Sequence, residues 1–266
     1  MTKIYYFSGT GNSLWSAKKI AEGIGGDCEL FNIGAAGQES EIVIEADSVV
    51  LVYPSYAYGL PVIVRRFIKQ AVFKTPNESS TQNEKSAPYI ASFVTYGSSP
   101  RGTQGELRRI LKKKGIVKMF FGNIPAVENY LALFGPPKAQ TFERRNIMQE
   151  KATEEAVRQV LERRENTVNT FCPFSAFVSW LFSLGIKIFY KYYRIGENCN
   201  GCAVCQKVCP VSAIIMRGGR PHWTKKCQNC QGCINICPLR AIQFGRVKFG
   251  TAGYIHHKIN ISDLYT

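Results

Sequence analysis

Eight of the ten cysteines lie between positions 199 and 237, and their spacing constrains the fold more than any other feature. Two sets of four have the same gaps, and each set ends in Cys-Pro: Cys199, Cys202, Cys205 and Cys209, then Cys227, Cys230, Cys233 and Cys237. Each cysteine of the second set lies 28 residues after its counterpart, and Ala213-Ile214 repeats as Ala241-Ile242 at the same offset. This internal duplication predicts a small domain built from two similar halves.

The gaps within each set suit cubane [4Fe–4S] clusters. Gaps of two residues let three thiolates converge on one cluster, while the fourth cysteine, followed by proline, points at the other cluster. One cluster is therefore expected on Cys199, Cys202, Cys205 and Cys237, and the other on Cys227, Cys230, Cys233 and Cys209. A zinc ribbon needs only two cysteine pairs and leaves the third cysteine and the Cys-Pro ending unexplained. A disulfide scaffold conflicts with a reducing compartment.

A hydroxyl-rich loop, Ser8-Gly9-Thr10-Gly11-Asn12-Ser13, follows the apolar strand pattern of residues 3–7. Because it opens a helix, its N–H groups and three hydroxyls can surround a dianionic phosphate. Leu14 occupies the place of the third glycine of a dinucleotide fingerprint, and the loop lacks the lysine of a P-loop. A terminal phosphomonoester such as FMN is favoured. An ordinary Gly/Ser turn with an Asn cap is the alternative.

Strand and helix patterns alternate through the first 166 residues. Further strands are expected at 29–33, 48–53, 88–96 and 117–124, and helices at 62–72, 102–114 and 141–165. The alternation predicts an α/β fold with a doubly wound, parallel, five-stranded sheet. We expect four parts: an α/β domain at 1–166, an apolar linker helix at 167–195, the cluster domain at 196–249 and a tail at 250–266.

Two loops rich in aromatics and glycine follow the third and fourth expected strands, at 54–59 and 95–102. Ligands of such sheets bind beyond the carboxyl ends of the strands, where aromatics can flank a planar ring and glycines let backbone approach it. Packing against other residues is the alternative role for each tyrosine. We expect at least one of Tyr56, Tyr58 and Tyr96 to contact a flavin.

Residues 4–23, 51–68 and 94–110 resemble flavodoxins. With the cysteine repeat, nearly the whole chain resembles the fused flavodoxin–ferredoxin iron–sulfur flavoproteins of anaerobic microbes, also described as ferredoxin-type oxidoreductases. The resemblance implies a flavodoxin-like domain and a small α+β ferredoxin domain of the bacterial 2[4Fe–4S] type. It implies that the FMN phosphate lies on Ser8, Thr10, Gly11, Asn12 and Ser13. It also implies that residues 54–59 and 96–102 hold the isoalloxazine, through Pro54, Ser55, Tyr56, Ala57, Gly59, Tyr96, Gly97, Arg101 and Gly102. Electron transfer is implied, without a named substrate.

The chain is strongly basic, with 34 Lys and Arg against 19 Asp and Glu and a formal charge of +15. Two oxidised clusters and a flavin phosphate lower this to roughly +9. We expect acidic redox partners such as ferredoxin or flavodoxin, and no nucleic acid, because no nucleic-acid module is recognised. An N-terminus that opens into a strand, together with clustered thiols, predicts a cytoplasmic protein, with membrane association as an open alternative.

Residues 168–186 carry no charge, and polar residues recur every fourth position at Ser175, Ser179, Ser183, Lys187 and Lys191. A helix with so narrow a polar stripe is buried or lies against lipid. The run is just long enough to span a bilayer, but Pro173 and the two lysines interrupt it, and an intracellular domain is expected on each side. We expect an inter-domain or in-plane helix, with burial favoured and peripheral membrane contact through 174–194 as the alternative.

Together these patterns predict an iron–sulfur flavoprotein that relays electrons between two clusters and FMN. A membrane-associated carrier without substrate chemistry is the second hypothesis. No catalytic constellation of Ser, His and Asp or of paired carboxylates can be argued. Because the loops 54–59 and 95–102 contain Arg101 and no carboxylate, the flavin is expected to have a higher reduction potential than ordinary flavodoxins.

Overall fold

The computed structural model describes residues 1–36, 41–76, 87–168 and 172–265. Residues 169–171 of the expected linker and Thr266 of the expected tail lie outside this range. The N-terminal domain contains a parallel sheet of β1 (Thr2–Tyr6), β2 (Cys28–Asn32), β4 (Ser48–Pro54), β6 (Tyr89–Tyr96) and β7 (Met119–Pro125). Its order, β2-β1-β4-β6-β7, is that of a flavodoxin-like doubly wound sheet, and its five parallel strands are those predicted from the sequence.

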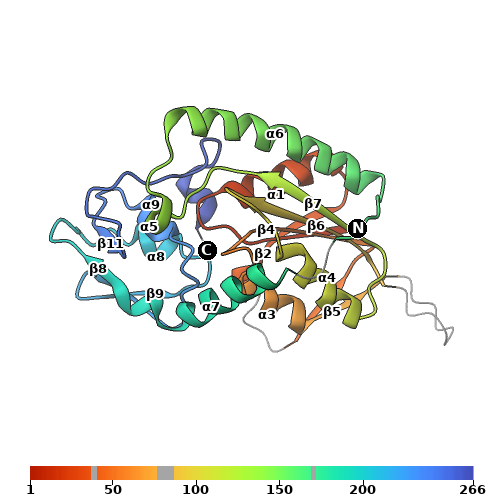
Figure 1. Ribbon diagram of the computed structural model, residues 1–266, viewed down its shortest axis with the longest axis horizontal. Helices are drawn as coiled ribbons and strands as arrows, with labels where there is room; N and C mark the ends of the chain where they lie inside the picture. Colours follow the sequence, from red (N-terminus) through yellow and green to blue (C-terminus); the bar gives the residue numbers. More distant parts are fainter. Residues whose placement is uncertain (37–40, 77–86, 169–171, 266) are drawn as a thin grey trace.

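Helices cover both faces of this sheet (Figure 1). On one face lie α1 (Asn12–Ile24) and α6 (Ala139–Leu161), and on the other lie α3 (Val62–Gln70) and α4 (Thr103–Lys113). The central strand β4 is buried from Ser48 to Tyr53, which explains its unbroken apolar run. Its side chains alternate between the two cores, so Val50 and Val52 pack with α1 and α6 while Val49 and Leu51 pack with α3.

Four short elements were not predicted. In the N-terminal domain these are α2 (Ile33–Ala36), α5 (Leu131–Phe134) and a separate parallel pair formed by β3 (Ile42–Glu45) and β5 (Ala71–Lys74). The expected helix at 62–72 ends at Gln70, because Ala71 takes an extended conformation and starts β5. Segments of four residues carry too little periodicity to be recognised from a sequence.

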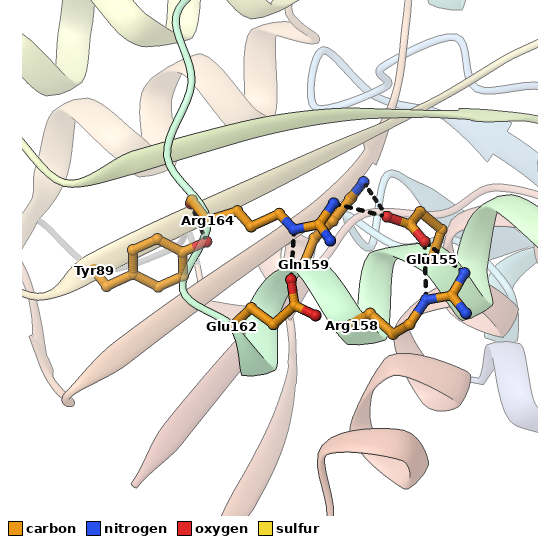
Figure 2. Close-up of polar contacts among 6 residues, drawn as sticks. All are labelled: Tyr89, Glu155, Arg158, Gln159, Glu162 and Arg164. Carbon is orange, nitrogen blue, oxygen red and sulfur yellow. Dashed lines mark hydrogen bonds and ion pairs between the residues drawn. The ribbon is translucent and has the colours of Figure 1, made fainter.

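The end of α6 is fastened to the sheet just before the linker begins, as Figure 2 shows. Tyr89, at the start of β6, donates a hydrogen bond of 2.8 Å from its hydroxyl to the Arg164 carbonyl. The Arg164 guanidinium pairs with Glu155 at 3.1 Å and with Glu162 at 2.5 Å. The ion pairs are solvent-exposed and add little stability, so the buried Tyr89 supplies most of this attachment.

The cluster domain repeats its backbone as well as its sequence. It contains the antiparallel pairs β8 (Tyr193–Ile195) with β11 (Ile242–Phe244) and β9 (Ile214–Arg217) with β10 (Arg220–Trp223), and the helices α8 (Val204–Lys207) and α9 (Gly232–Ile236). Left-handed residues recur at the 28-residue offset: Gly201 with Asn229, Ala203 with Gln231, and Ser212 with Arg240. Such conformations cost non-glycine residues free energy, so both halves are held to one loop geometry.

Helix α7 (Pro173–Phe189) lies on the outside of the molecule and leads through the 3-10 turn η1 (Tyr190–Tyr192) into β8. Its serines face inward, and Ser175 is 1% exposed. Six of its large apolar side chains are exposed, including Phe177 at 60% and Trp180 at 57%. The prediction that burial is favoured for this helix is therefore wrong. The segment Pro173–Tyr192 is also the one helical segment in the described residues that is long and apolar enough to cross a membrane.

The tail from residue 250 bridges both domains and ends in the 3-10 turn η2 (Ile261–Leu264). The Tyr254 hydroxyl donates to Asn12 Oδ1 at 2.6 Å, and the Tyr254 amide donates to Asn235 Oδ1 at 2.9 Å. His256 stacks on Trp15 of α1 with ring centroids 4.8 Å apart. Since Asn12 belongs to the phosphate loop and Asn235 to α9, the tail fixes that loop against the cluster domain.

Candidate functional site

A cavity of about 530 Å³ opens beyond the carboxyl ends of β1, β4, β6 and β7, where doubly wound sheets bind their ligands. Its volume lies in the usual range for small-molecule and cofactor sites. Ten of the fourteen predicted cofactor contacts line it: Ser8, Thr10, Asn12, Ser13, Pro54, Ser55, Tyr56, Ala57, Tyr96 and Gly97. The phosphate loop and both aromatic loops thus share one cavity.

The hydroxyls of the phosphate loop are held in place by neighbouring loops. Ser13 shares a hydrogen bond of 2.8 Å with Thr95, and the Asn129 amide donates to the Thr10 hydroxyl. Ser8, Thr10 and Ser13 are all buried, and helix α1 begins at the end of this loop. The first turn of α1 carries no acidic residue. Polar hydrogens at a helix N-terminus without a competing carboxylate fit a phosphate dianion.

Gly59 and Gly102, expected at the ring, do not line the cavity. A Cβ atom on Gly59 would stand 1.8 Å from Ser179 Oγ, and one on Gly102 would stand 2.6 Å from Ser175 Oγ. Both glycines therefore make room for the serine face of α7 rather than for a ligand. The glycines and the serines that they contact lie far apart in the sequence, and no sequence pattern predicts that they meet.

Gly11 and Arg101 also lie outside the cavity. Gly11 has a φ of 100° and backs onto the tail, where an added Cβ would stand 3.0 Å from His256 Cβ. Arg101 is exposed, and its guanidinium lies 5.8 Å from the ring centroid of Tyr58. Arg101, which was expected to contact the flavin ring, is therefore not among the residues that line the cavity.

A third loop, after β7, lines the cavity and was not predicted. It brings Glu128, Asn129 and Tyr130 to the site. The Glu128 carboxylate accepts the amides of Asn129 and Tyr130 at 3.1 and 3.2 Å, and burial raises the pKa of this carboxyl group. A Cβ atom on Gly97 would stand 2.3 Å from Glu128 Oε2, so that glycine admits the carboxylate. The sequence did contain a signal for this contact: Glu128 follows the fifth strand closely, at the edge of the sheet where ligands bind.

Helix α7 forms one wall of the same cavity. Val178, Leu181 and Phe182 line it, and the Phe182 ring meets Tyr56 edge-on with centroids 6.3 Å apart. Tyr130 approaches Phe182 in the same way at 6.1 Å. The linker helix thus encloses a cavity whose polar loops come from the α/β domain.

Four cysteines from both repeats gather near the far end of the cluster domain. Cys199, Cys202, Cys205 and Cys237 line one small pocket, in which Cys202 is exposed. Burial, followed by the neighbouring Cys237, raises the pKa of Cys205 to about 12. Such a thiol is neutral unless a metal or cluster replaces its proton.

The other four cysteines gather beside the cavity of the α/β domain. Cys209 stands close enough to Cys227, Cys230 and Cys233 to raise the pKa of each, after the larger effect of burial, and the pKa of Cys227 reaches about 11. Cys230 itself lines the cavity. The structure therefore juxtaposes both crossed sets that the spacing predicts.

The repeated Ala-Ile pairs have a structural role. The Ala213 amide donates to Cys209 Sγ at 3.2 Å, and the Ala241 amide donates to Cys237 Sγ at 3.3 Å. Such bonds stabilise negative charge on the sulfur.

Within the described residues, no group of three or more His, Cys, Asp or Glu side chains is placed so that it could hold a single metal ion.

The phosphate loop and the second cysteine loop touch through glycines. A Cβ atom on Gly232 would stand 2.5 Å from the Gly9 carbonyl oxygen, and one on Gly9 would stand 3.1 Å from Cys230 Cβ. The Asn229 amide also donates to the Tyr130 hydroxyl at 2.8 Å. The phosphate loop and the cysteine loop are thus in direct backbone contact.

A protein-family match identifies the cysteine-rich part of the chain. Residues 191–238 match the 4Fe-4S dicluster domain family. Solved structures similar to the N-terminal part include an azoreductase from Bacillus anthracis (12% identity, 59% of this chain, 98% of that chain, TM-score 0.39). Others are the Trp repressor binding protein from Bacillus subtilis (15%, 62%, 100%, 0.37) and two-electron reduced flavodoxin from Megasphaera elsdenii (16%, 58%, 99%, 0.32). No curated protein matches the chain.

The strand order and the matched dicluster domain define the class of this protein. A flavodoxin-like domain of five parallel strands is joined to a C-terminal 4Fe-4S dicluster ferredoxin domain. The chain thus joins a flavodoxin-like fold to a 4Fe-4S dicluster domain, an architecture suited to electron transfer.

The juxtaposition of the cysteines predicts which cluster each mutation damages. Cys237→Ala is expected to abolish the EPR signal of the cluster near Cys199, Cys202 and Cys205, although Cys237 belongs to the other repeat. Cys209→Ala is expected to abolish the other signal. Cys28→Ala is the control and leaves both signals intact. Loss of the cluster nearest in sequence in either variant would contradict crossed ligation.

Proposed function

We propose that this protein relays electrons between two [4Fe–4S] clusters and FMN, as a ferredoxin-linked oxidoreductase. The observation that carries the proposal is that Cys230 lines the cavity that also contains the phosphate loop. When bound, FMN exchanges two electrons and each cluster one, so the pair of clusters matches the flavin in stoichiometry. The protein's own residues hold the cofactors at short range and exclude water between them.

The positions of the two sets of cysteines suggest a path for electrons from the surface to the cavity. The set containing Cys202 lies at the surface, and the set containing Cys230 is buried against the cavity. An external redox protein therefore meets the outer cluster first. Residues 196–249 carry eight basic residues against Glu197 alone. This charge favours an acidic partner such as a ferredoxin.

The residues of the cavity fit FMN in kind. Ser8, Thr10 and Ser13 suit its phosphate, and Tyr56 and Tyr96 offer faces or edges to a planar ring. The mouth is apolar, because Leu133, Phe134 and Leu181 line the cavity and remain exposed. An electron acceptor with apolar parts fits such an opening better than a highly charged one.

Cofactor content tests this proposal directly. Anaerobic purification followed by iron, sulfide and flavin analysis is expected to give eight iron atoms and one FMN per chain, because two cubanes and one flavin are proposed. Thr10→Glu is expected to expel the flavin by charge repulsion at the phosphate site while iron content stays unchanged. Val117→Glu, a surface substitution far from the loop in sequence, is the matched control. Zinc in place of iron, or FAD in place of FMN, would refute the assignment.

The position of Glu128 in the cavity predicts that this residue lowers the reduction potential of the flavin. An ionised carboxylate in the cavity repels the anionic reduced flavin, so Glu128→Gln is expected to raise the flavin reduction potential. The expected change is about 1 kcal/mol, or some tens of millivolts for one electron. Arg101→Glu is expected to have a smaller effect, since Arg101 is exposed and does not line the cavity.

The same substitution has a defined pH dependence. Because burial raises the pKa of the Glu128 carboxyl group, it becomes neutral at a higher pH than an ordinary glutamate. The difference in potential between the wild type and Glu128→Gln should shrink as the pH falls through that pKa. Redox titration at several pH values measures this. A difference that stays constant with pH, or an Arg101→Glu effect that exceeds it, would contradict this role for Glu128.

A further inference from the structure

Helix α7 presents an apolar face to the outside of the molecule. Six large side chains at intervals of three and four residues form this face and are exposed: Phe174, Phe177, Trp180, Leu181, Leu184 and Ile188. Residues at these intervals share one side of a helix. Singly exposed apolar side chains need no explanation, but a contiguous row of this size marks an interaction surface.

The opposite face of the helix is polar and packed against the protein. Ser175 and Ser179 are buried where Gly102 and Gly59 admit them, and Ile186 is buried with them. A surface helix of a soluble protein normally has the reverse orientation, with its apolar face inward. The orientation of α7 is therefore fixed by close serine–glycine contacts, and its apolar row is left facing away from the core.

Basic side chains border one edge of this row. A groove between α7 and helices α3 and α4 is lined by Arg65 and Arg109 together with Trp180. The adjoining groove is lined by further cations, Lys69, Lys113 and Lys114. Of the described residues that line the two grooves, Glu106 alone is acidic, and it pairs with Arg65. An apolar row with a basic border matches a lipid surface that carries negative charge.

The other edge of the row continues into a second apolar patch. Leu133 and Phe134 of α5 are exposed and line the cavity together with Leu181. The apolar face therefore extends beyond one helix and borders the mouth of the cavity.

The structure argues against α7 as a membrane span. The serine face of α7 is packed against the α/β domain, and the two domains it joins are in contact through Gly9 and Gly232. A helix that crossed a bilayer would have to leave these contacts and separate the domains. The exposed Lys187, inside the helix, would then lie in the hydrocarbon region.

A second copy of the chain fits this face less well than lipid does. Antiparallel pairing of two α7 faces, about a twofold axis across the helices, would bring the two basic grooves together. Like charges across such an interface oppose association, whereas anionic headgroups neutralise them. We propose that α7 docks the protein in plane onto an anionic lipid membrane, with its apolar row in the acyl boundary and the basic side chains of α3 and α4 against the headgroups.

Flotation of the holoprotein with vesicles tests this proposal. The wild type is expected to float with phosphatidylcholine vesicles that contain phosphatidylglycerol and to bind pure phosphatidylcholine more weakly. Phe177→Glu combined with Trp180→Glu is expected to lower binding at least about tenfold, because both anchors are lost and negative charge is added. Val117→Glu combined with Leu161→Glu is the matched control, since it removes two exposed apolar residues elsewhere and adds the same charge.

Two further measurements keep the test decisive. Unchanged cluster and flavin absorption in both double variants shows that they are folded. Quenching of wild-type tryptophan fluorescence by brominated lipid needs no variant and is expected if Trp180 enters the acyl boundary. The proposal is overturned if the wild type binds neither kind of vesicle, or if both double variants bind equally. It is also overturned if the wild type is a dimer that the α7 variant converts to monomers without any vesicle binding, since the face would then be a protein interface.

Discussion

The backbone contact between the phosphate loop and the second cysteine loop determines how the rest of the molecule is arranged. A side chain on Gly232 would collide with the Gly9 carbonyl, and one on Gly9 would crowd Cys230. Gly34 leaves similar room for the Pro210 carbonyl oxygen, which follows the crossing cysteine Cys209. Because three glycines form this interface, the domains approach at backbone distance. The tail packs against the same phosphate loop at Gly11, and α7 runs along the outside of the α/β domain (Figure 1).

This contact sets the order in which the proposed redox sites follow one another through the molecule. The exposed Cys202 marks the outer end of the cluster domain, Cys230 marks the inner end, and the phosphate loop follows without an intervening layer of protein. The basic surface of the cluster domain suits an acidic donor at the outer end. At the inner end the cavity opens between α5 and α7, beside the apolar face that we assign to lipid. Donor and acceptor would thus reach the protein at separate surfaces.

The sequence predicted the features that depend on local pattern. Strand β4 is a continuous apolar run, and the cysteine spacing repeats without error, so the sheet, the duplicated domain and most of the cavity's polar residues could be predicted. Features that depend on long-range contact could not. Gly59 and Gly102 seemed suited to a ligand because the serines that they admit lie far along the chain. The outward orientation of α7 was equally hidden, because a helix with one polar stripe does not reveal which side the protein covers.

The central claim is that the cluster beside the cavity is an obligatory step between an external donor and the flavin. Rapid anaerobic mixing with a reduced acidic ferredoxin, followed by flavin absorbance, tests it most directly. In Cys227→Ala, which removes a buried cysteine that we propose as a ligand of the inner cluster, flavin reduction should slow by orders of magnitude while flavin content stays unchanged. Flavin that is reduced at the wild-type rate in a variant proven to lack this cluster would contradict the account.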